Sequence, residues 1–481
     1  MTELLASLLR KRGPIRRIGV VGMGYVGIPA AALFADVPAY EHVLGFQRDS
    51  PTSGYKIGML NRGESPLDAD EPGLGDLIRR VVKAGKFRCT HDFSGIAGLD
   101  AVTIAIQTPF LNPQDLEPDL TPLADGLRQV GRHLSEGTLV VLESTITPGT
   151  TCGLAREILE SESGLTAGEE FALAHAPERV MVGRLLRNIR EHDRVVGGID
   201  AASTARAIEL YTPVLAGGRI IPMTATAAEV TKTAENALRD LQIAAINQLA
   251  LYCEAMGVNV YDVREGIASL KGEGITRGVL WPGAGVGGHC LTKDTWHLER
   301  GVKILGGKAG GPSGSPSLFS ISRAVNDYMP HHMRDLTLQG LQRAGIPAAG
   351  ATVALLGWAF IRNSGDARNT PAEPYRNLML SAGARVRVHD PYVEDYPGIE
   401  FERDLDEALR GADAVAIFTA HDIYRRLNPD LLYSLCGRHR RPVIVDGRNL
   451  VDPDAFIESG CVYLGVGRGD RNRHPLKEQS R

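Results

Sequence analysis

The chain has 481 residues, 43% of them hydrophobic and 23% charged, which provides enough apolar material for two or three folded domains. Its formal net charge of −4 excludes the basic surface that nucleic acid or an anionic membrane would require. No run approaches the roughly 20 apolar residues of a membrane span. Residues 1–14 lack the apolar core and cleavage site of a signal peptide.

The six cysteines are scattered, with no CxxC pair and no regular framework. This usage indicates free thiols in a reducing cytoplasm. His289 and Cys290 come nearest to a pair of metal ligands, but adjacent residues without further ligands rarely build a metal site. We therefore expect a cytoplasmic protein without a metal ion.

The first part of the chain alternates short apolar runs with helical segments. A short amphipathic helix is predicted within residues 1–14. Buried strands are predicted at residues 16–21, 42–46, 101–106 and 138–144. The segments between them are long enough for crossover helices, so we expect a mostly parallel, doubly wound sheet. We place the end of this domain at residue 217, in the turn that follows the helical segment AASTARAIELY.

The middle of the chain has a different pattern. From about Thr224 to Gly257 there is no proline or internal glycine and the apolar residues keep helical spacing, which predicts one helix of roughly 30 residues. The stretch WPGAGVGGHCLTKD (281–294) breaks this pattern and predicts a loop. Residues 306–317 are rich in glycine and proline and predict a turn-rich linker. We assign residues 218–335 to a central helical domain.

Residues 336–481 repeat the strand-and-helix pattern. Strands are predicted at 351–360, 385–391, 414–420 and 442–449. Alternation with helical segments again indicates a parallel sheet, with ligands at the carboxyl ends of its strands. The polar tail from about Gly469 is expected to fray. The fold class is therefore α/β, with two Rossmann-like doubly wound domains joined by a central long-helix domain.

A glycine-rich turn joins the first predicted strand to the first helix. Gly22, Gly24 and Gly27 form the sequence GxGxxG, with Tyr25 and Val26 between them. Such glycines permit a tight turn and close approach of the backbone to a pyrophosphate at a helix N-terminus. We assign these five residues to a dinucleotide site; a plain glycine-rich turn is the alternative.

The end of the second predicted strand departs from the usual pattern for NAD. An acidic residue is expected there for the ribose hydroxyls, but the sequence is GFQRD, with Gln47 followed by Arg48 and Asp49. Gln47 can bond the ribose, or Asp49 can replace it from a shifted loop. Arg48 offers a partner for a 2′-phosphate, which makes NADP the alternative cofactor, or it is an ordinary surface arginine. We also assign Thr108 to the cofactor site.

Cys290 lies in a loop of closely spaced glycines, Gly283, Gly285, Gly287 and Gly288. These glycines let backbone amides approach an anionic or carbonyl group. Lys293 and Asp294 follow at once and place charged groups near the thiol. The residues by themselves leave open whether Cys290 is a nucleophile or a structural cysteine.

The order of several motifs resembles that of the UDP-sugar 6-dehydrogenases. The motifs are GMGYVG, ESTITPGTT (143–151), APERV (176–180), KTAENALRDLQIAAINQLA (232–250), GAGVGGHCLTKD (283–294), SRAVNDYMP (322–330), GWAFIRNSGDARNTP (357–371) and HDPYV (389–393). The resemblance runs from Arg17 to about Gly447, and GVGGHC and SRAVNDYMP are similar to the branch that acts on UDP-N-acetylhexosamines. It implies an NAD-binding and a UDP-binding lobe, joined by a long helix at the interface of a homodimer or higher homo-oligomer.

The resemblance also implies roles for individual residues. Cys290 would attack a C6 aldehyde, and the resulting thiohemiacetal would be oxidised to a thioester that water cleaves. Lys232 and Asn236, four residues apart on one helix face, would polarise the C6 oxygen and stabilise oxyanions. By its position in the helical repeat alone, Lys232 is expected to be a solvent-exposed lysine. The residues implied to hold water or assist proton transfer are Glu178, Thr145 and Asp294.

Further contacts with the nucleotide sugar are expected from Arg179, Gly287 and Gly288. Arg277 is implied to reach a sugar in the partner subunit, although its spacing from Cys290 differs from that in UDP-glucose enzymes. We assign Arg368 to the cofactor site and Arg448 to the substrate site. The alternative for both residues is a salt bridge at the protein surface. The family usually has a lysine directly after the motif GxAF, whereas this chain has Ile361 followed by Arg362. The contacts between the C-terminal α/β domain and the nucleotide are therefore in question.

Three other functions fit parts of this pattern. A UDP-glucose 6-dehydrogenase that forms UDP-glucuronate would share the order of these motifs, but GVGGHC and SRAVNDYMP are less similar to that branch. A two-electron hydroxyacid dehydrogenase of related architecture also uses a lysine and an asparagine on its central helix, but has no use for Cys290 or the second α/β lobe. A catalytically weak nucleotide-sugar-binding homologue would have lost Cys290, Lys232 or the glycine turn, and all three are present.

Overall fold

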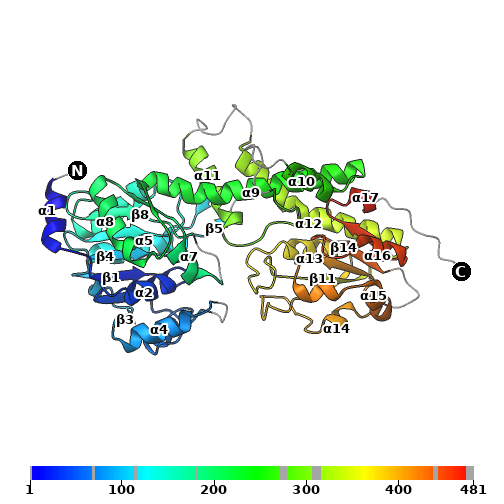
Figure 1. The fold of residues 1–481 in the computed structure, drawn as a ribbon, viewed down its shortest axis with the longest axis horizontal. Coiled ribbons are helices and arrows are strands. Elements are labelled where there is room, and N and C mark those ends of the chain that lie inside the picture. Colours follow the sequence, from blue (N-terminus) through cyan, green and yellow to red (C-terminus); the bar gives the residue numbers. More distant parts are fainter. Residues whose placement is uncertain are drawn as a thin grey trace. The chain divides into compact units, whose positions relative to one another are not determined.

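The computed structural model describes residues 3–67, 71–112, 116–179, 183–269, 279–305, 316–436 and 442–472. The chain folds as two compact units (Figure 1). The first unit consists of Met1–Glu235 with His297–Ala309, and the second of Asn236–Trp296 with Gly310–Arg481. The domain boundaries at residues 217 and 335 stay predictions.

The first unit contains an eight-stranded sheet in the order β10-β9-β8-β7-β4-β1-β2-β3. Its strands are β1 (Arg17–Val21), β2 (His42–Phe46), β3 (Phe87–Thr90), β4 (Ala101–Ile104), β7 (Leu139–Leu142), β8 (Ala172–His175), β9 (Arg194–Gly198) and β10 (Ile220–Thr224). β8 and β9 pair antiparallel and every other neighbouring pair is parallel, so β9 and β10 run opposite to the other six strands. The predicted, mostly parallel sheet is confirmed.

Helices cover both faces of this sheet. They are α1 (Glu3–Arg12), α2 (Gly27–Asp36), α3 (Tyr55–Asn61), α4 (Leu74–Lys83), α5 (Thr121–Arg132), α6 (Arg156–Ser163), α7 (Leu185–Glu191) and α8 (Ala201–Tyr211). Shorter pieces are the ribbon β5 (Phe110–Asn112) and β6 (Glu117–Pro118), the turns η1 (Phe93–Ile96) and η4 (Thr212–Val214), and the π-helical turn η3 (Thr151–Ala155). Because both faces are covered, the central strands β4, β7 and β8 are buried along their whole length.

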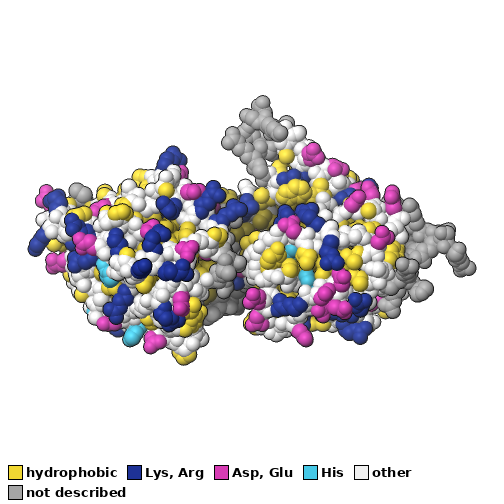
Figure 2. Space-filling view, turned by 60° about the horizontal axis from the view of Figure 1, so that its bottom comes forward, with side chains coloured by type: hydrophobic (Ala, Val, Ile, Leu, Met, Phe, Trp, Pro, Cys, Tyr) yellow, Lys and Arg dark blue, Asp and Glu magenta, His cyan; other side chains and the backbone are white. Residues whose placement is uncertain are grey.

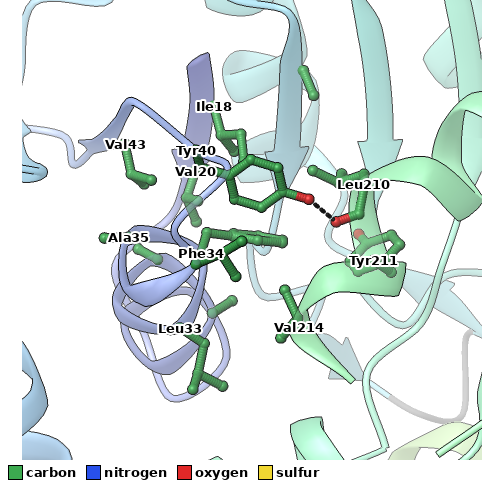
Figure 3. Packing of buried hydrophobic residues seen from close by; sticks show 14 of the residues in the cluster. Ile18, Val20, Leu33, Phe34, Ala35, Tyr40, Val43, Leu210, Tyr211 and Val214 are labelled. Carbon is green, nitrogen blue, oxygen red and sulfur yellow. Dashed lines mark hydrogen bonds between the residues drawn. The ribbon is translucent and has the colours of Figure 1, made fainter. Parts of the chain in front are cut away.

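Buried side chains of α2 and α8 share one core with the strands beneath them (Figure 3). Phe34 packs against Tyr40 and Tyr211, and the Tyr40 hydroxyl donates to the Leu210 carbonyl at 2.6 Å. Leu123 and Leu159, from α5 and α6, belong to the core on the opposite face. This packing fixes the loops at the strand ends, which carry the candidate site.

The second unit contains a parallel five-stranded sheet in the order β12-β11-β13-β14-β15. Its strands are β11 (Thr352–Leu356), β12 (Arg385–His389), β13 (Ala414–Ile417), β14 (Val443–Asp446) and β15 (Val462–Gly465). Its helices are α10 (Val260–Ala268), α12 (Leu318–Arg343), α13 (Ala372–Ser381), α14 (Leu405–Leu409), α15 (Pro429–Cys436), α16 (Pro453–Glu458) and α17 (Gly469–Asn472), with the 3-10 turn η5 (Asp422–Arg426). α12 and α13 contribute to the core on one face, and α14, α15 and α16 to the core on the other.

Two helices continue from one unit into the other. α9 (Ala225–Met256) is the predicted long helix, and α11 (Leu291–Ile304) begins directly after Cys290. In the described part of the chain, no helix is long and apolar enough to cross a membrane. Acidic and basic side chains are interspersed on the face of both units drawn in Figure 2.

Some of the predicted elements differ from the observed ones. The tail expected to fray from Gly469 instead forms α17, because the Asn472 side chain bonds the backbone of Gly465 and the carboxylate of Glu254. Residues 473–481 and most of the predicted linker (306–315) lie outside the described residues. Among the described residues, seven strands were not predicted, namely β3, β5, β6, β8, β9, β10 and β15.

Candidate functional site

The glycine turn follows β1 and leads into α2. A Cβ on Gly22, where φ is +97°, would lie 2.7 Å from the Ala105 carbonyl oxygen, and a Cβ on Gly27 would lie 2.0 Å from the Gly22 carbonyl oxygen. Both glycines are therefore required by the surrounding backbone. Gly24 differs, because a Cβ added there would have no described heavy atom within 4 Å beyond its chain neighbours.

The space above Gly24 fits a phosphate group. α2 begins after Val26, and no side chain caps its N-terminus by a hydrogen bond. Its first backbone N–H groups and the positive end of the helix dipole suit an anion. Tyr25, the remaining residue assigned here, is 40% exposed. The turn therefore has the geometry that a dinucleotide pyrophosphate requires.

The carboxamide of Gln47 faces the glycine turn. Its Oε1 accepts from the Met23 N–H at 3.1 Å, and its Nε2 donates to Ser53 Oγ at 2.9 Å. Lys56 donates to the Met23 carbonyl at 3.0 Å, and burial lowers the pKa of its ammonium group. Arg48 is exposed. Lys56 was not predicted as part of the site, because nothing in the local sequence ties a lysine of α3 to a turn more than 30 residues earlier.

Three further predicted residues follow neighbouring strands of the same sheet. Thr108, Thr145 and Glu178 come after β4, β7 and β8, while the glycine turn comes after β1. Since these four strands are parallel neighbours, the four segments lie at one edge of the sheet. The Thr108 hydroxyl is buried and donates to the Thr145 carbonyl. The first unit thus brings the glycine turn and these three polar residues to the same edge of its sheet.

Glu178 is held at both carboxylate oxygens. Oε1 accepts from the Arg179 N–H at 3.0 Å, and Oε2 accepts from Arg194. The Arg179 guanidinium donates to the Asp193 carbonyl and pairs with Glu235 at 3.5 Å. Arg194 was not predicted from the sequence, where its only signal is a charged residue at the start of the apolar run RVVGG.

In the second unit, Cys290 occupies the N-terminus of α11. Its carbonyl accepts from the N–H groups of Lys293 at 3.1 Å and Asp294 at 2.8 Å, as an N-cap residue does. Cys290 is exposed, so it is not a cysteine of an apolar core. The positive end of a helix dipole stabilises an anion such as a thiolate at this position.

Asp294, one helical turn after Cys290, contacts Asn236 of α9. The Asn236 amide donates to the carboxylate of Asp294, which is fully buried. Lys232 lies four residues before Asn236 on α9 and is only 8% exposed. The alternative of an exposed helical lysine at this position is therefore wrong.

The glycine loop is held by residues 360–369 of the last lobe. A Cβ added to Gly287 or Gly288 would lie 2.7 Å or 2.8 Å, respectively, from an atom of Phe360. The Gly288 N–H donates to the Arg368 carbonyl at 2.8 Å, and the Asn369 amide donates to the Gly288 carbonyl at 3.1 Å. Packing alone therefore explains these two glycines, and their contact with a substrate stays a prediction.

The predicted arginines have different surroundings. The Arg368 guanidinium is paired with Asp366 on its own loop, with the closer oxygen at 2.6 Å. Arg448, after β14, donates to the Phe418 carbonyl at 2.6 Å, and its Nη1 would lie 2.6 Å from a Cβ added to Gly283. Arg448 is thus built into the glycine loop rather than into a surface ion pair. Arg277 lies outside the described residues.

Three domains of one family match the chain in order. They are its NAD binding domain over residues 16–215, its central domain over 226–326 and its UDP binding domain over 354–453. The chain belongs to the UDP-glucose/GDP-mannose dehydrogenase family. It is therefore a nucleotide-sugar 6-dehydrogenase, which oxidises a CH–OH group with NAD, and the two-electron hydroxyacid dehydrogenase weighed above is wrong.

This dehydrogenase is similar to proteins whose names contain N-acetylated sugars. A crystal structure of NDP-N-acetyl-D-galactosaminuronic acid dehydrogenase from Methanosarcina mazei Go1 is 66% identical, with a TM-score of 0.92, and covers 99% of this chain and 100% of that one. UDP-N-acetyl-D-mannosamine dehydrogenase from Pyrococcus horikoshii is 34% identical over 94% of this chain and its own full length. NDP-N-acetyl-D-galactosaminuronic acid dehydrogenase from Ralstonia solanacearum is 32% identical over 90% of this chain and 96% of its own.

The glycine turn of the dehydrogenase allows a matched test of the cofactor site. Gly24→Ala is expected to raise KM for NAD about tenfold or more, with an unchanged thermal midpoint, because the new methyl group enters open space that we expect the cofactor phosphate to occupy. Gly27→Ala is the control, and it should lower the thermal midpoint because its Cβ collides with backbone. An unchanged KM in Gly24→Ala would remove this turn from the cofactor site.

Gln47 gives a second test, of cofactor preference. Gln47→Glu keeps an acceptor for the Met23 N–H and adds a negative charge at the position expected to face the ribose. We expect the ratio of kcat/KM for NAD over NADP to rise about tenfold, because a carboxylate repels a 2′-phosphate. Arg48→Gln should change the ratio in the same direction if Arg48 meets that phosphate. An unchanged ratio in both variants would place the 2′ position elsewhere.

Proposed function

We propose that this dehydrogenase oxidises C6 of a UDP-N-acetylhexosamine to a carboxylate, in two successive two-electron steps. The observation that carries the proposal is the exposed Cys290 thiol at the N-terminus of α11, one helical turn before buried Asp294. Oxidation of an alcohol to an aldehyde needs no thiol, whereas oxidation of an aldehyde to an acid proceeds readily through a thioester. The N-acetylated sugars in the names of the similar proteins favour this substrate over UDP-glucose.

The reaction uses one thiol and one water. The C6 alcohol first loses a hydride and a proton, which gives an aldehyde. The Cys290 sulfur adds to the aldehyde carbon as a thiohemiacetal, and loss of a second hydride and a proton leaves a thioester. Water cleaves the thioester, which releases the carboxylate with one proton and restores the thiol. NAD, when bound at the glycine turn after β1, would supply the hydride acceptor for both oxidations, so one sugar would consume two NAD and one water and yield two NADH and three protons.

Other side chains support this chemistry. Lys232 and Asn236 share one face of α9, and a cation with an amide donor there suits an oxyanion on C6. Asp294 fixes the Asn236 amide by a direct hydrogen bond. Glu178 and Thr145, at the strand ends of the first unit, are assigned to the water and to proton transfer.

A panel of UDP-sugars tests the proposal. The panel contains UDP-glucose and the UDP-N-acetyl derivatives of glucosamine, galactosamine and mannosamine, each incubated with NAD or NADP. We expect one N-acetylated sugar to give two NADH per molecule of uronic acid, measured by absorbance and mass spectrometry. Preference for UDP-glucose would overturn the substrate, and a ratio of one NADH with an aldehyde product would overturn the four-electron reaction.

We also infer that the protein is a homo-oligomer of the cytoplasm. Several large apolar side chains of α9 and α12 are exposed, namely Leu238, Tyr252, Met256, Leu318, Ile321 and Tyr328. Tyr252 and Met256 share one face of α9, and Leu318 and Ile321 share one face of α12; exposed apolar faces are typical of protein interfaces. A cytoplasmic location agrees with the six free cysteines. Sedimentation equilibrium of the full chain measures the oligomeric state, and a monomer at micromolar concentration would contradict the first inference.

A further inference from the structure

Arg194, the first residue of β9, is enclosed by two carboxylates and an aromatic ring. Its Nη1 bonds Glu178, and its Nη2 donates to Glu143 Oε1 at 3.0 Å and to the Ala176 carbonyl at 3.2 Å. The guanidinium carbon lies 3.8 Å from the centre of the Tyr211 ring. The side chains of Arg194, Glu143 and Glu178 are 6%, 0% and 7% exposed. A cation is thus fixed inside the first unit, directly behind a residue assigned to the chemistry.

The reversal of β9 explains how Arg194 reaches Glu178. In the antiparallel pair, His175 of β8 lies opposite Gly197 of β9. Continuing this register by three residues past the end of β8 brings Glu178 opposite Arg194. A parallel β9 would place its first residue at the other edge of the sheet. Because β9 is antiparallel to β8, the Arg194 guanidinium lies at the same edge of the sheet as Glu178.

Glu143 holds Arg194 at the terminal nitrogen that does not bond Glu178. Burial raises the pKa of Glu143 to about 7, and its Oε1 accepts from the Tyr211 hydroxyl at 2.7 Å. The charged and titratable groups around it are Arg194, Glu178, Tyr211 and His175. Burial lowers the pKa of His175 to about 3 and raises that of Tyr211 well above its ordinary value, so both stay neutral near pH 7. Glu143 is therefore a group of this cluster that changes charge near neutral pH.

We propose that Arg194 is a positioning residue for Glu178, clamped in turn by Glu143 and Tyr211. The bond from Arg194 fixes the rotamer of the Glu178 carboxylate, and the water-dependent release of acid requires a fixed carboxylate. This inference rests on the proposed function, in which Glu178 acts on that water. When Glu143 is protonated, Arg194 has one carboxylate to neutralise. When Glu143 ionises, the two carboxylates compete for the same cation.

Rapid mixing of enzyme, NAD and UDP-sugar, with NADH followed by absorbance, distinguishes a loss of Glu178 positioning from a loss of folded enzyme. In wild type and variants, the two oxidations precede hydrolysis of the thioester, so slow hydrolysis produces a burst of up to two NADH per subunit before the steady state. We expect Arg194→Lys to keep the burst and to lower the steady-state rate about 10- to 100-fold, because lysine keeps the charge but loses the two-pronged bridge. Arg219→Lys is the control, since Arg219 forms an ion pair and is 81% exposed.

If Arg194→Lys folds poorly, Glu143→Gln and Tyr211→Phe test the same proposal without changing Arg194. Glu143→Gln should remove an inflection near pH 7 from the steady-state pH profile, and Tyr211→Phe should lower the steady-state rate without changing the burst. Equal loss of burst and steady-state rate in each variant would show a merely structural role and overturn the proposal. So would wild-type kinetics in all three. A wild-type enzyme that forms no NADH with any UDP-sugar would overturn the proposed function itself, and this inference with it.

Discussion

Cys290→Ser is expected to reduce formation of the uronic acid about 1000-fold or more, because a serine hydroxyl replaces the sulfur that forms the thioester. The substituted side chain is exposed at a helix N-terminus, so folding and NAD binding should be unchanged. The measurement is uronic acid by mass spectrometry together with NADH per sugar. The first oxidation does not need the thiol, so trapped aldehyde at no more than one NADH per sugar is the expected product.

Cys152→Ser is the matched control for this variant. Cys152 is the other exposed free cysteine, and it lies in the first unit within the π-helical turn. We expect it to retain the wild-type rate and the ratio of two NADH per acid. Full turnover to acid by Cys290→Ser would exclude covalent catalysis through this sulfur. A loss of activity in Cys152→Ser as large as that in Cys290→Ser would point to a general role of thiols in stability.

Asp240→Asn is expected to destabilise the second unit by about 3 kcal/mol, because it leaves the guanidinium of Arg323 without its buried counter-ion. The two side chains are 0% and 3% exposed and are 2.6 Å apart, and Ser322 and Asn326 also donate to the same carboxylate. Burial raises the pKa of Asp240 although Arg323 opposes the shift, so desolvation already offsets much of the attraction within the pair. The predicted cost therefore comes from the cation left in the interior.

Asp327→Asn is the control for this pair. Asp327 bonds the same arginine from α12 but is 61% exposed. Removing its charge should cost no more than about 1 kcal/mol, because water screens an exposed ion pair. Thermal midpoints of the two variants, measured at one pH and protein concentration, provide the comparison. Equal shifts would mean that burial of Asp240 does not decide the energetics of this contact.

Local features of the sequence were enough to predict the chemistry-bearing segments. Glycines at fixed offsets between an apolar run and a helical pattern predict the turn at Gly22, and a long stretch without proline or glycine predicts α9, because both are short-range consequences of backbone conformation. The strands missed were short or atypical: β3 has four residues, β8 contains two alanines, and β9 ends in two glycines. Their strand character comes from burial between neighbours rather than from their own composition.

The tertiary structure alone decided how these segments act on one another. The direction of β9 brings Arg194 into contact with Glu178, and packing buries Lys232, which helical spacing alone would place at the surface. The same holds for Gln47, whose carboxamide contacts a turn 24 residues earlier in the chain. A sequence specifies residue types and local conformation directly. Pairing between distant segments depends on the free energy of the whole packed unit, so it becomes visible only once the unit has folded.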